Sequence, residues 1–315
     1  MHLAVIEINS ECNLKCKHCY GFFENKQIID LFEFENILLQ LKQEGISIVR
    51  ISGGEPTLMG SKIFEYAKVA KKYFKHVELT TNGVTKLSGL KEEWRLFSNI
   101  QVSVDGTEEI HDWVRGKGTY SKSMKFINEL KEYKNSVSVM ISIGRHNLEH
   151  VLELKKILDE IDVKLFAERI TSTGRGHDLG KLDYHEVKKI MQLLNDNLVG
   201  SSDPLLTMMN PSIKDFLHEN CIIGGCSAGI SAICIDSSLN VLPCPRLRKT
   251  MGNLAEMTLS EIIKTKEFQK LGDRDLLEGK CGKCSDKWIC GGCRADSYEE
   301  MINYYGEDSG CFYNV

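Results

Sequence analysis

Three cysteines within eight residues have the spacing of a redox or metal site. They stand in the stretch SECNLKCKHCYG (10–21) and are Cys12, Cys16 and Cys19. A closed structural zinc site takes four ligands, so this triplet is one thiol short. A [4Fe–4S] cluster also normally takes four thiolates, and a cluster held by three keeps one iron open to a small molecule. The spacing therefore indicates an iron–sulfur cluster with one open iron.

The other cysteines lie far from this triplet. The chain of 315 residues holds 12 cysteines, with none between residues 20 and 220 and nine between 221 and 311. A disulfide-stabilised secreted domain is usually far shorter, and the first residues, MHLAVIEIN, lack the regions of a signal peptide. Clustered cysteines in such a chain indicate metal or redox sites, and we expect a cytoplasmic protein.

Composition and charge narrow the range of partners. Hydrophobic residues make up 42% of the chain, charged residues make up 27%, and the net charge is −4. This balance gives no electrostatic reason to expect nucleic acid or an anionic membrane surface as a partner. No apolar run approaches the roughly 18 residues of a membrane span. We therefore expect no nucleic acid and no membrane among the partners.

Strand and helix patterns alternate over the first 200 residues. Apolar runs rich in β-branched residues predict strands at 3–8, 46–52, 76–81, 99–104, 136–144 and 162–170. Helical periodicity predicts helices at 31–45, 62–74, 120–133, 148–161 and 183–200. This alternation predicts an α/β fold with a parallel sheet and helices outside it. Six such strands suit a partial (β/α)6 barrel, in which chemistry takes place at the carboxyl ends of the strands.

The pattern changes after GSSDPLL (200–206). Proline, glycine and cysteine become frequent, and helical periodicity is confined to about 258–271. We therefore expect a core domain at residues 1–200 and a small, loop-rich, cysteine-held domain at 201–315. Because the first strand begins at residue 3, we expect no added N-terminal peptide-recognition domain.

Polar motifs follow the predicted strands. ISGGEP (51–56) ends the second strand, where two glycines allow close approach of the backbone to a ligand and Glu55 can accept hydrogen bonds from an ammonium group. The later strands end in LTTNG, VSVDG, SIGRHN and ERITSTGRG. Plain turn chemistry is the alternative for Asn-Gly and Asp-Gly.

The cysteine triplet after a first strand resembles the signature of the radical S-adenosylmethionine (radical SAM) family, and ISGGEP resembles its Gly-Gly-Glu-Pro motif. The resemblance implies that the open iron binds the amino and carboxylate groups of SAM, and that an electron from the cluster releases a 5′-deoxyadenosyl radical. It also implies a set of residues that contact SAM: His18, Gly53, Gly54, Glu55, Asn82, Ser103, Asp105, Ser142, Arg145 and Ile170. In this set His18 and Ile170 would lie near the adenine, and Arg145 would hold the carboxylate.

The C-terminal cysteines resemble the SPASM extension of radical SAM enzymes. CSAG (226–229), VLPCP (241–245) and GNL (252–254) accompany them. The resemblance implies two closed auxiliary [4Fe–4S] clusters, and so three clusters in all. One would take Cys221, Cys226, Cys244 and Cys293, and the other would take Cys281, Cys284, Cys290 and Cys311.

Two departures from the SPASM pattern are local. Gly291 and Gly292 alone separate Cys290 from Cys293, where the family usually has three residues, and Leu239 stands where a glycine is common. The remaining cysteine, Cys234, lies in the apolar run SAICID and is expected in the core, with a role as ligand left open. A zinc ribbon over 281–293 is the rival metal site, but its cysteine pairs are only five residues apart.

The resemblance implies an enzyme that oxidatively modifies a peptide, as in ribosomal-peptide maturation with thioether or carbon crosslinks. A porphyrin-type or other cofactor maturase and a sulfatase-maturing enzyme are the alternatives. A pure electron carrier or scaffold protein would need neither the open iron nor the Gly-Gly-Glu-Pro motif. HDWVRG (111–116) resembles a stretch of peptide-modifying members, in which Arg115 either acts near the site or pairs on the surface. Expected partners are the peptide, a reducing electron donor and, as an open alternative, a separate recognition protein.

Overall fold

The computed structural model describes residues 1–21, 26–87, 91–133, 135–209 and 225–313. Within these residues a single sheet of nine strands runs through the molecule in the order β6-β5-β4-β3-β2-β1-β7-β8-β9. Six of its strands are consecutive and parallel: β1 (Leu3–Glu7), β2 (Ile48–Ser52), β3 (His76–Thr81), β4 (Asn99–Ser103), β5 (Val137–Ile143) and β6 (Lys164–Arg169). The predicted α/β fold with a parallel-rich sheet is confirmed.

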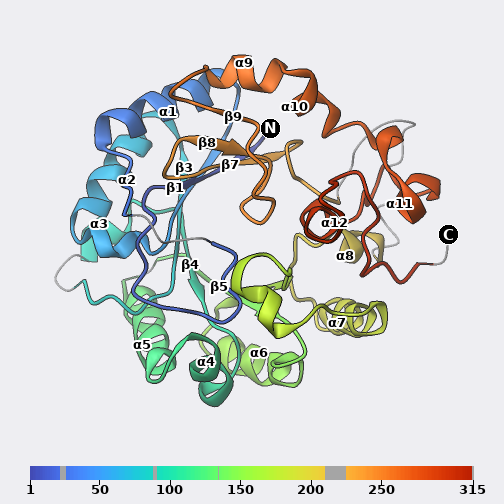
Figure 1. Ribbon diagram of the computed structural model, residues 1–315. Coiled ribbons are helices and arrows are strands. Elements are labelled where there is room, and N and C mark those ends of the chain that lie inside the picture. Colours follow the sequence, from blue (N-terminus) through green and yellow to red (C-terminus); the bar gives the residue numbers. More distant parts are fainter. Residues whose placement is uncertain (22–25, 88–90, 134, 210–224, 314–315) are drawn as a thin grey trace.

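Helices cover the outside of these six strands (Figure 1). They are α1 (Leu31–Gln43), α2 (Lys62–Tyr73), α3 (Lys91–Trp94), α4 (Glu108–Arg115), α5 (Thr119–Glu132), α6 (Val151–Glu160) and α7 (Tyr184–Asp196). Asp30 begins α1 because its side chain accepts a hydrogen bond from the Glu33 amide. The buried residues of α1 follow a helical period of three to four, at Phe34, Ile37, Leu38 and Leu41. The two short helices α3 and α4 were not predicted.

The two faces of the parallel strands differ in chemistry. Side chains that point toward the helices are apolar and fully buried, including Ile6, Ile51, Leu79, Ile100 and Ile141. Side chains at the alternate positions point inward and are mostly polar, including Arg50, Thr80, Gln101, Ser103 and Ser142. Because successive side chains of a strand point to opposite faces, this period of two builds a core outside the sheet and a polar interior inside it.

The C-terminal part of the chain extends the same sheet. Strand β7 (Ala232–Ile235) pairs in parallel with β1, and β8 (Asn240–Leu242) and β9 (Gly252–Asn253) add antiparallel neighbours. The sheet is therefore continuous across the predicted boundary at residue 200, which stays a prediction.

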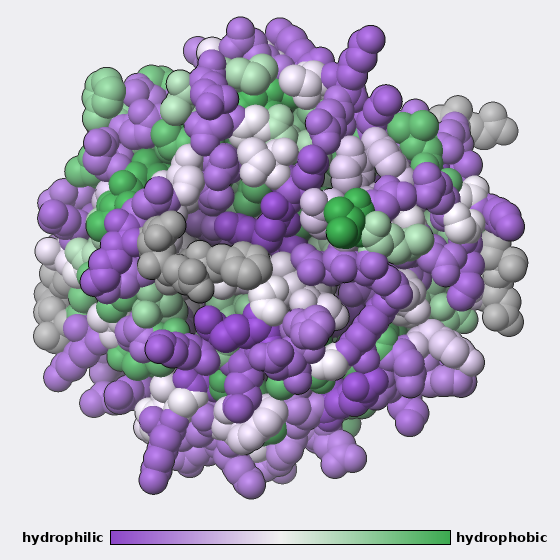
Figure 2. Space-filling view, viewed as in Figure 1, coloured by the Kyte–Doolittle hydropathy of each residue, from purple (hydrophilic) through white to green (hydrophobic). Residues whose placement is uncertain are grey.

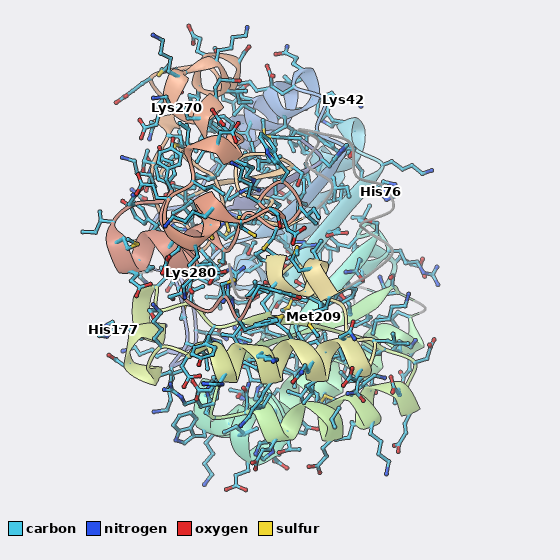
Figure 3. All side chains as sticks on the ribbon, turned by 90° about the vertical axis from the view of Figure 1, so that its right-hand side faces the viewer. Lys42, His76, His177, Met209, Lys270 and Lys280 are labelled. Carbon is cyan, nitrogen blue, oxygen red and sulfur yellow. The ribbon has the colours of Figure 1, made fainter. Side chains whose placement is uncertain are left out.

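The C-terminal part also holds more helix than the sequence predicts. Its helices are α8 (Pro204–Met209), α9 (Leu259–Lys264), α10 (Lys266–Lys270), α11 (Gly279–Lys283) and α12 (Arg294–Met301). The prediction that helix is confined to about 258–271 is wrong, because five- to eight-residue helices are too short to show a period. Figure 3 shows these elements from the side. Lys270 on α10 lies above Lys280 on α11 in this view, and Met209 at the end of α8 lies below both.

The surface is mostly hydrophilic on the side seen in Figure 2, with apolar residues scattered among polar ones. In the part of the chain that the structure describes, every helix is too short or too polar to cross a membrane.

Candidate active site

The cysteine triplet lies in the long loop between β1 and α1. Cys16 is buried, and Cys12 and Cys19 are partly exposed. Hydrogen bonds fix this loop to three neighbouring segments: Glu55 N to Glu11 O (2.8 Å), Lys17 N to Val114 O (3.0 Å) and Arg175 Nε to Cys16 O (2.8 Å). The ends of β2, α4 and the segment after β6 therefore position the loop that carries the three cysteines.

Two glycines after β2 permit the closest of these contacts. A Cβ atom on Gly53 would lie 2.2 Å from Asn9 Oδ1, and one on Gly54 would lie 2.3 Å from Glu11 O. Both distances are far inside van der Waals contact, so a side chain is excluded at either position. The sequence predicts close approach to a ligand, and the structure shows that the glycines are needed first for the approach of the cysteine loop itself.

The Glu55 carboxylate is buried near the carboxyl ends of β2 and β3. Its Oε1 accepts hydrogen bonds from the Thr57 amide (3.0 Å) and from the hydroxyls of Thr57 (2.6 Å) and Thr81 (2.7 Å). Its Oε2 accepts one from the Asn82 amide (2.7 Å). Burial raises the pKa of Glu55, and these donors act against that rise. Oε2 keeps acceptor capacity for a further donor, as the predicted role toward an ammonium group requires.

A buried charge cluster lies behind the triplet. Asp105 is fully buried, and its Oδ2 accepts hydrogen bonds from Arg115 Nε (2.5 Å) and His18 Nε2 (2.7 Å). Burial alone would raise the pKa of Asp105, but Arg115 and His18 outweigh it and hold this pKa well below the usual range. Arg115 Nη1 also lies 3.9 Å from Cys16 Sγ. Arg115 therefore pairs with Asp105 in a buried position and not on the surface. That it acts in the reaction stays a prediction.

One cavity joins this loop to the C-terminal cysteines. It has a volume of about 330 Å³ and is bounded at one side by the triplet and at the other by Cys226, Cys244 and Cys293. Eight of the ten residues predicted to contact SAM line it: His18, Gly53, Gly54, Glu55, Asn82, Ser103, Ser142 and Ile170.

The other two predicted contact residues lie elsewhere. Arg145 is half-exposed and forms an ion pair with Glu186 on α7, because the turn after β5 directs its side chain away from the interior. It does not line the cavity, and its predicted role as a carboxylate ligand finds no support in this geometry. Asp105 has no exposed surface and lies behind His18 and Arg115, so it positions these two side chains instead of facing the cavity.

A second, smaller cavity collects another set of cysteines. Its volume is about 20 Å³, and its lining includes Cys281, Cys284, Cys290 and Cys311. These are the four thiols that the resemblance groups together. Cys221, predicted to join Cys226, Cys244 and Cys293, lies outside the described residues.

The short link between Cys290 and Cys293 still sends the two thiols to different cavities. Gly291 and Gly292 both have left-handed backbone angles, with φ of +68° and +61°. Each lies against a neighbour that leaves no room for a side chain: a Cβ atom would be 2.0 Å from Arg274 Nη1 at Gly291 and 2.6 Å from Arg294 Nη2 at Gly292. Two consecutive left-handed residues make the tight turn that a longer link would otherwise provide.

Cys234 has no exposed surface and packs in the middle of β7 against Val5 and Leu242. Its predicted place in the core is confirmed. Burial raises the pKa of this thiol well above its usual value, and Glu7 adds to the rise.

The donor sets suit iron–sulfur clusters. The triplet, Cys226, Cys244 and Cys293 line the large cavity, and four further cysteines line the small one. Within the described residues, no three His, Cys, Asp or Glu side chains lie close enough to hold a single metal ion. Burial raises the pKa of Cys12 to about 12 and also raises the pKa of Cys16 and Cys244 in the metal-free protein. Thiols so buried become thiolates when a positively charged iron centre stabilises them.

Several cavity residues were not predicted. They include Arg50 and Gln101 at inward strand positions, Arg175 beside the triplet, and Glu168 and Arg246 near the C-terminal cysteines. The alternation of apolar and polar residues in IVRIS (48–52) and NIQVS (99–103) was a usable signal for the first two.

Family models and known proteins agree with this geometry. The radical SAM superfamily model matches residues 6–158, and the SPASM model, an iron–sulfur cluster-binding domain, matches residues 226–285. The fold and site define a radical SAM enzyme. The chain belongs to the radical SAM superfamily and carries a C-terminal SPASM domain, so SAM and iron–sulfur clusters are its cofactors. The SPASM match ends before Cys290, so the ligand sets stay predictions.

The relatives differ in what they do. An AdoMet-dependent heme synthase of Methanosarcina barkeri is 28% identical over 98% of this chain and 95% of its own length. A cysteine-type anaerobic sulfatase-maturating enzyme of Clostridium perfringens is 26% identical over 97% and 93%. The subtilosin biosynthesis protein AlbA of Bacillus subtilis is 25% identical over 92% of this chain and 66% of its own length.

Solved structures share the fold. The structure of anSMEcpe with bound AdoMet superposes with a TM-score of 0.78 at 23% identity, covering 98% of this chain and 93% of that one. Streptococcus suis SuiB bound to its precursor peptide SuiA gives a TM-score of 0.81 at 21% identity, covering 99% and 76%.

Proposed function

We propose that this enzyme reductively cleaves SAM and oxidatively modifies a peptide, forming a thioether or carbon crosslink. The observation that carries the proposal is that one cavity is lined both by the triplet and by Cys226, Cys244 and Cys293. A substrate in this cavity lies between a place where a radical is generated and a place that can accept an electron. Oxidation of a substrate radical needs both.

Three [4Fe–4S] clusters are proposed, one on the triplet and two on the C-terminal ligand sets. Bound to SAM and reduced, the first supplies a 5′-deoxyadenosyl radical that abstracts hydrogen from the substrate. The protein's part is to bind and orient. Oε2 of Glu55 is free to accept a hydrogen bond from the SAM amino group, and Ile170 offers an apolar surface to the adenine.

The charges of the cavity favour a peptide over a porphyrin. A porphyrin substrate with several carboxylates calls for unpaired cations, since those give charge-assisted hydrogen bonds. Here four of the five arginines that line the cavity are paired with carboxylates: Arg50 with Glu78 (2.7 Å), Arg115 with Asp105 (2.5 Å), Arg169 with Asp203 (2.7 Å) and Arg246 with Glu168 (3.0 Å). Arg175 donates only to the neutral Cys16 carbonyl (2.8 Å), so it is the one cavity arginine without a carboxylate partner among the described residues. A neutral peptide backbone needs no such cation.

Known relatives support this proposal and its main alternative. AlbA is named for bacteriocin biosynthesis, and both SuiB and anSMEcpe have been solved with peptides bound. The AdoMet-dependent heme synthases favour the alternative, a porphyrin-type maturase, and the sulfatase-maturating enzymes favour a third.

Partners and compartment follow from the chemistry. We propose a low-potential electron donor, because reductive cleavage consumes an electron. Recognition of the peptide, directly or through a separate protein, is part of the same proposal. A reducing cytoplasm would keep the 12 cysteines available for clusters.

The test is anaerobic turnover with SAM and a strong reductant. One reaction contains a short cysteine-containing precursor peptide, and a parallel reaction contains a carboxylated porphyrin. A peptide product about two mass units lighter, absent without SAM, is expected because a crosslink removes two hydrogens. Turnover of the porphyrin alone would replace the proposal with its alternative.

Metal analysis tests the cofactor count separately. Anaerobic reconstitution should yield about twelve irons per chain, since each cubane holds about four. About eight would mean that one auxiliary cluster is absent. One zinc with about four irons would contradict the assignment of the C-terminal cysteines to clusters.

A further inference from the structure

Arg274 is a buried cation with free hydrogen-bond donors. It begins a short 3-10 segment (Arg274–Leu276) and is 1% exposed. Its Nη2 donates to the Cys226 carbonyl at 3.0 Å. Its Nε and Nη1 are buried without a hydrogen-bond partner among the described residues. Buried guanidinium donors are normally satisfied, so these two nitrogens call for an acceptor.

The guanidinium lies where the two C-terminal cysteine sets meet. The Cys226 amide donates to the Cys290 carbonyl at 2.9 Å, which joins the two ligand loops. At this junction Arg274 packs on Gly291 so closely that a Cβ atom there would lie 2.0 Å from Nη1 and 2.2 Å from Cζ. Cys226 borders the large cavity, whereas Cys290 borders the small one.

The electrostatics fit this position. The guanidinium contacts both ligand loops, through the Cys226 carbonyl and through Gly291 next to Cys290. A cubane with four thiolates carries net negative charge, so it would offset the cost of burying this guanidinium.

The neighbouring Arg294 has each of its three nitrogens engaged: besides bonds to backbone carbonyls, its Nη2 donates to Cys281 Sγ at 3.6 Å. Its Nη1 donates to the carbonyls of Tyr304 (2.9 Å) and Gly306 (2.6 Å), and its Nε donates to Gly292 O (3.3 Å). These bonds fasten loops together. Arg274 makes one such bond and keeps two donors free.

We propose that Arg274 tunes both auxiliary clusters, donating its free N–H groups to cluster sulfur and placing one positive charge between the two sites. The inference rests on the proposed cluster ligation. Hydrogen bonds to sulfur and nearby positive charge stabilise the reduced, more negative cluster, and so raise its reduction potential. Arg274 thus makes the auxiliary clusters better electron acceptors for the substrate radical.

The test compares Arg274→Gln and Arg274→Lys with the parent protein in full-length, reconstituted form. Iron content is measured first. Reduction potentials then come from redox titration followed by electron paramagnetic resonance (EPR), in which signals that do not change on addition of SAM report the auxiliary clusters. Lys283→Gln is the matched control, because it removes one positive charge next to Cys284 from an exposed position on α11.

Each outcome decides the inference. We expect Arg274→Gln to shift at least one auxiliary potential to a more negative value, Arg274→Lys to recover most of the shift, and Lys283→Gln to leave both potentials unchanged. Loss of auxiliary iron in the Gln variant with retention in the Lys variant would also support the role of the charge. Unshifted potentials at full iron content, or equal iron loss in both variants, would overturn it. A parent protein with about four irons would instead refute the proposed function.

Discussion

Replacing Arg115 by methionine should destabilise the protein strongly, because it leaves a charge buried without its main partner. The Arg115 side chain is 9% exposed and the Asp105 side chain 0% exposed, and they meet at 2.5 Å. Removing one partner of a buried ion pair typically costs about 3–5 kcal/mol of unfolding free energy. Asp105 would retain His18, at 2.7 Å, as its remaining side-chain partner.

A second substitution separates lost contacts from a stranded charge. In Asp105→Asn/Arg115→Met, position 105 no longer carries a charged carboxylate. The double variant should therefore be more stable than Arg115→Met alone. Arg145→Met is the control: its ion pair with Glu186 is 49% exposed on the arginine side, so the change should cost far less than Arg115→Met.

The assay is anaerobic urea unfolding of the reconstituted proteins, with production of 5′-deoxyadenosine measured in parallel. Arg115→Met should also lower the rate of SAM cleavage, because Arg115 contacts two residues of the cysteine loop, Cys16 through Nη1 and His18 through Nη2. An unfolding cost near that of Arg145→Met, or a double variant no more stable than Arg115→Met, would refute the reasoning.

Three further predictions follow from the same site. Changing all three cysteines of the triplet, Cys12, Cys16 and Cys19, to alanine should abolish 5′-deoxyadenosine production and leave about eight irons per chain. Product analysis and metal analysis measure the two effects. Gly54→Ala should reduce SAM cleavage at least tenfold, because its Cβ would lie 2.3 Å from Glu11 O, whereas Gly272→Ala, with nothing nearer than 3.9 Å, should not. The depressed pKa of Asp105 means that its contribution to stability is present above the ordinary aspartate pKa of about 3.9 and is lost as pH falls through the folded value. Arg115→Met should therefore move this acid loss to higher pH, as urea midpoints measured against pH will show.

Much of the fold was predictable because the spacing of apolar residues along the chain distinguishes strands from helices. The six parallel strands lie within two residues of their predicted bounds, since β-branched runs bounded by polar residues have few alternatives. The features that the sequence did not predict are short helices and pairings between distant segments. Helix α12 spans eight residues, and the pairing of β7 with β1 joins segments more than 200 residues apart.

The candidate site was predictable where a motif fixes the position of the backbone. It was less predictable where the role depends on the orientation of a side chain. Cys16, Gly54 and Glu55 lie at the cavity because strand ends and loop contacts place them there. Arg145 follows a strand end too, yet it turns outward to Glu186, a partner on a helix 41 residues later. A local sequence pattern carries no signal for such a pairing.

Register between β1 and β7 sets the separation of the two thiol sets that face the large cavity. The triplet follows the end of β1, whereas Cys244 lies beyond β8 at the level where Leu3 pairs with Ala232, at the start of β1. Because five residues of strand rise about 16 Å, we expect the two sets to lie on the order of 15 Å apart along the inner face of the sheet.

A substrate that reacts near the triplet and passes an electron to the second site can lie within this span, next to bound SAM. An extended peptide of about five residues has that length, because it rises at the same rate as β1. Pulsed EPR on the reduced protein should therefore find the SAM-binding cluster and the nearer auxiliary cluster on the order of 15 Å apart. A separation of about 8 Å or less would mean that no peptide of this length lies between them, and the cavity would then serve a smaller substrate.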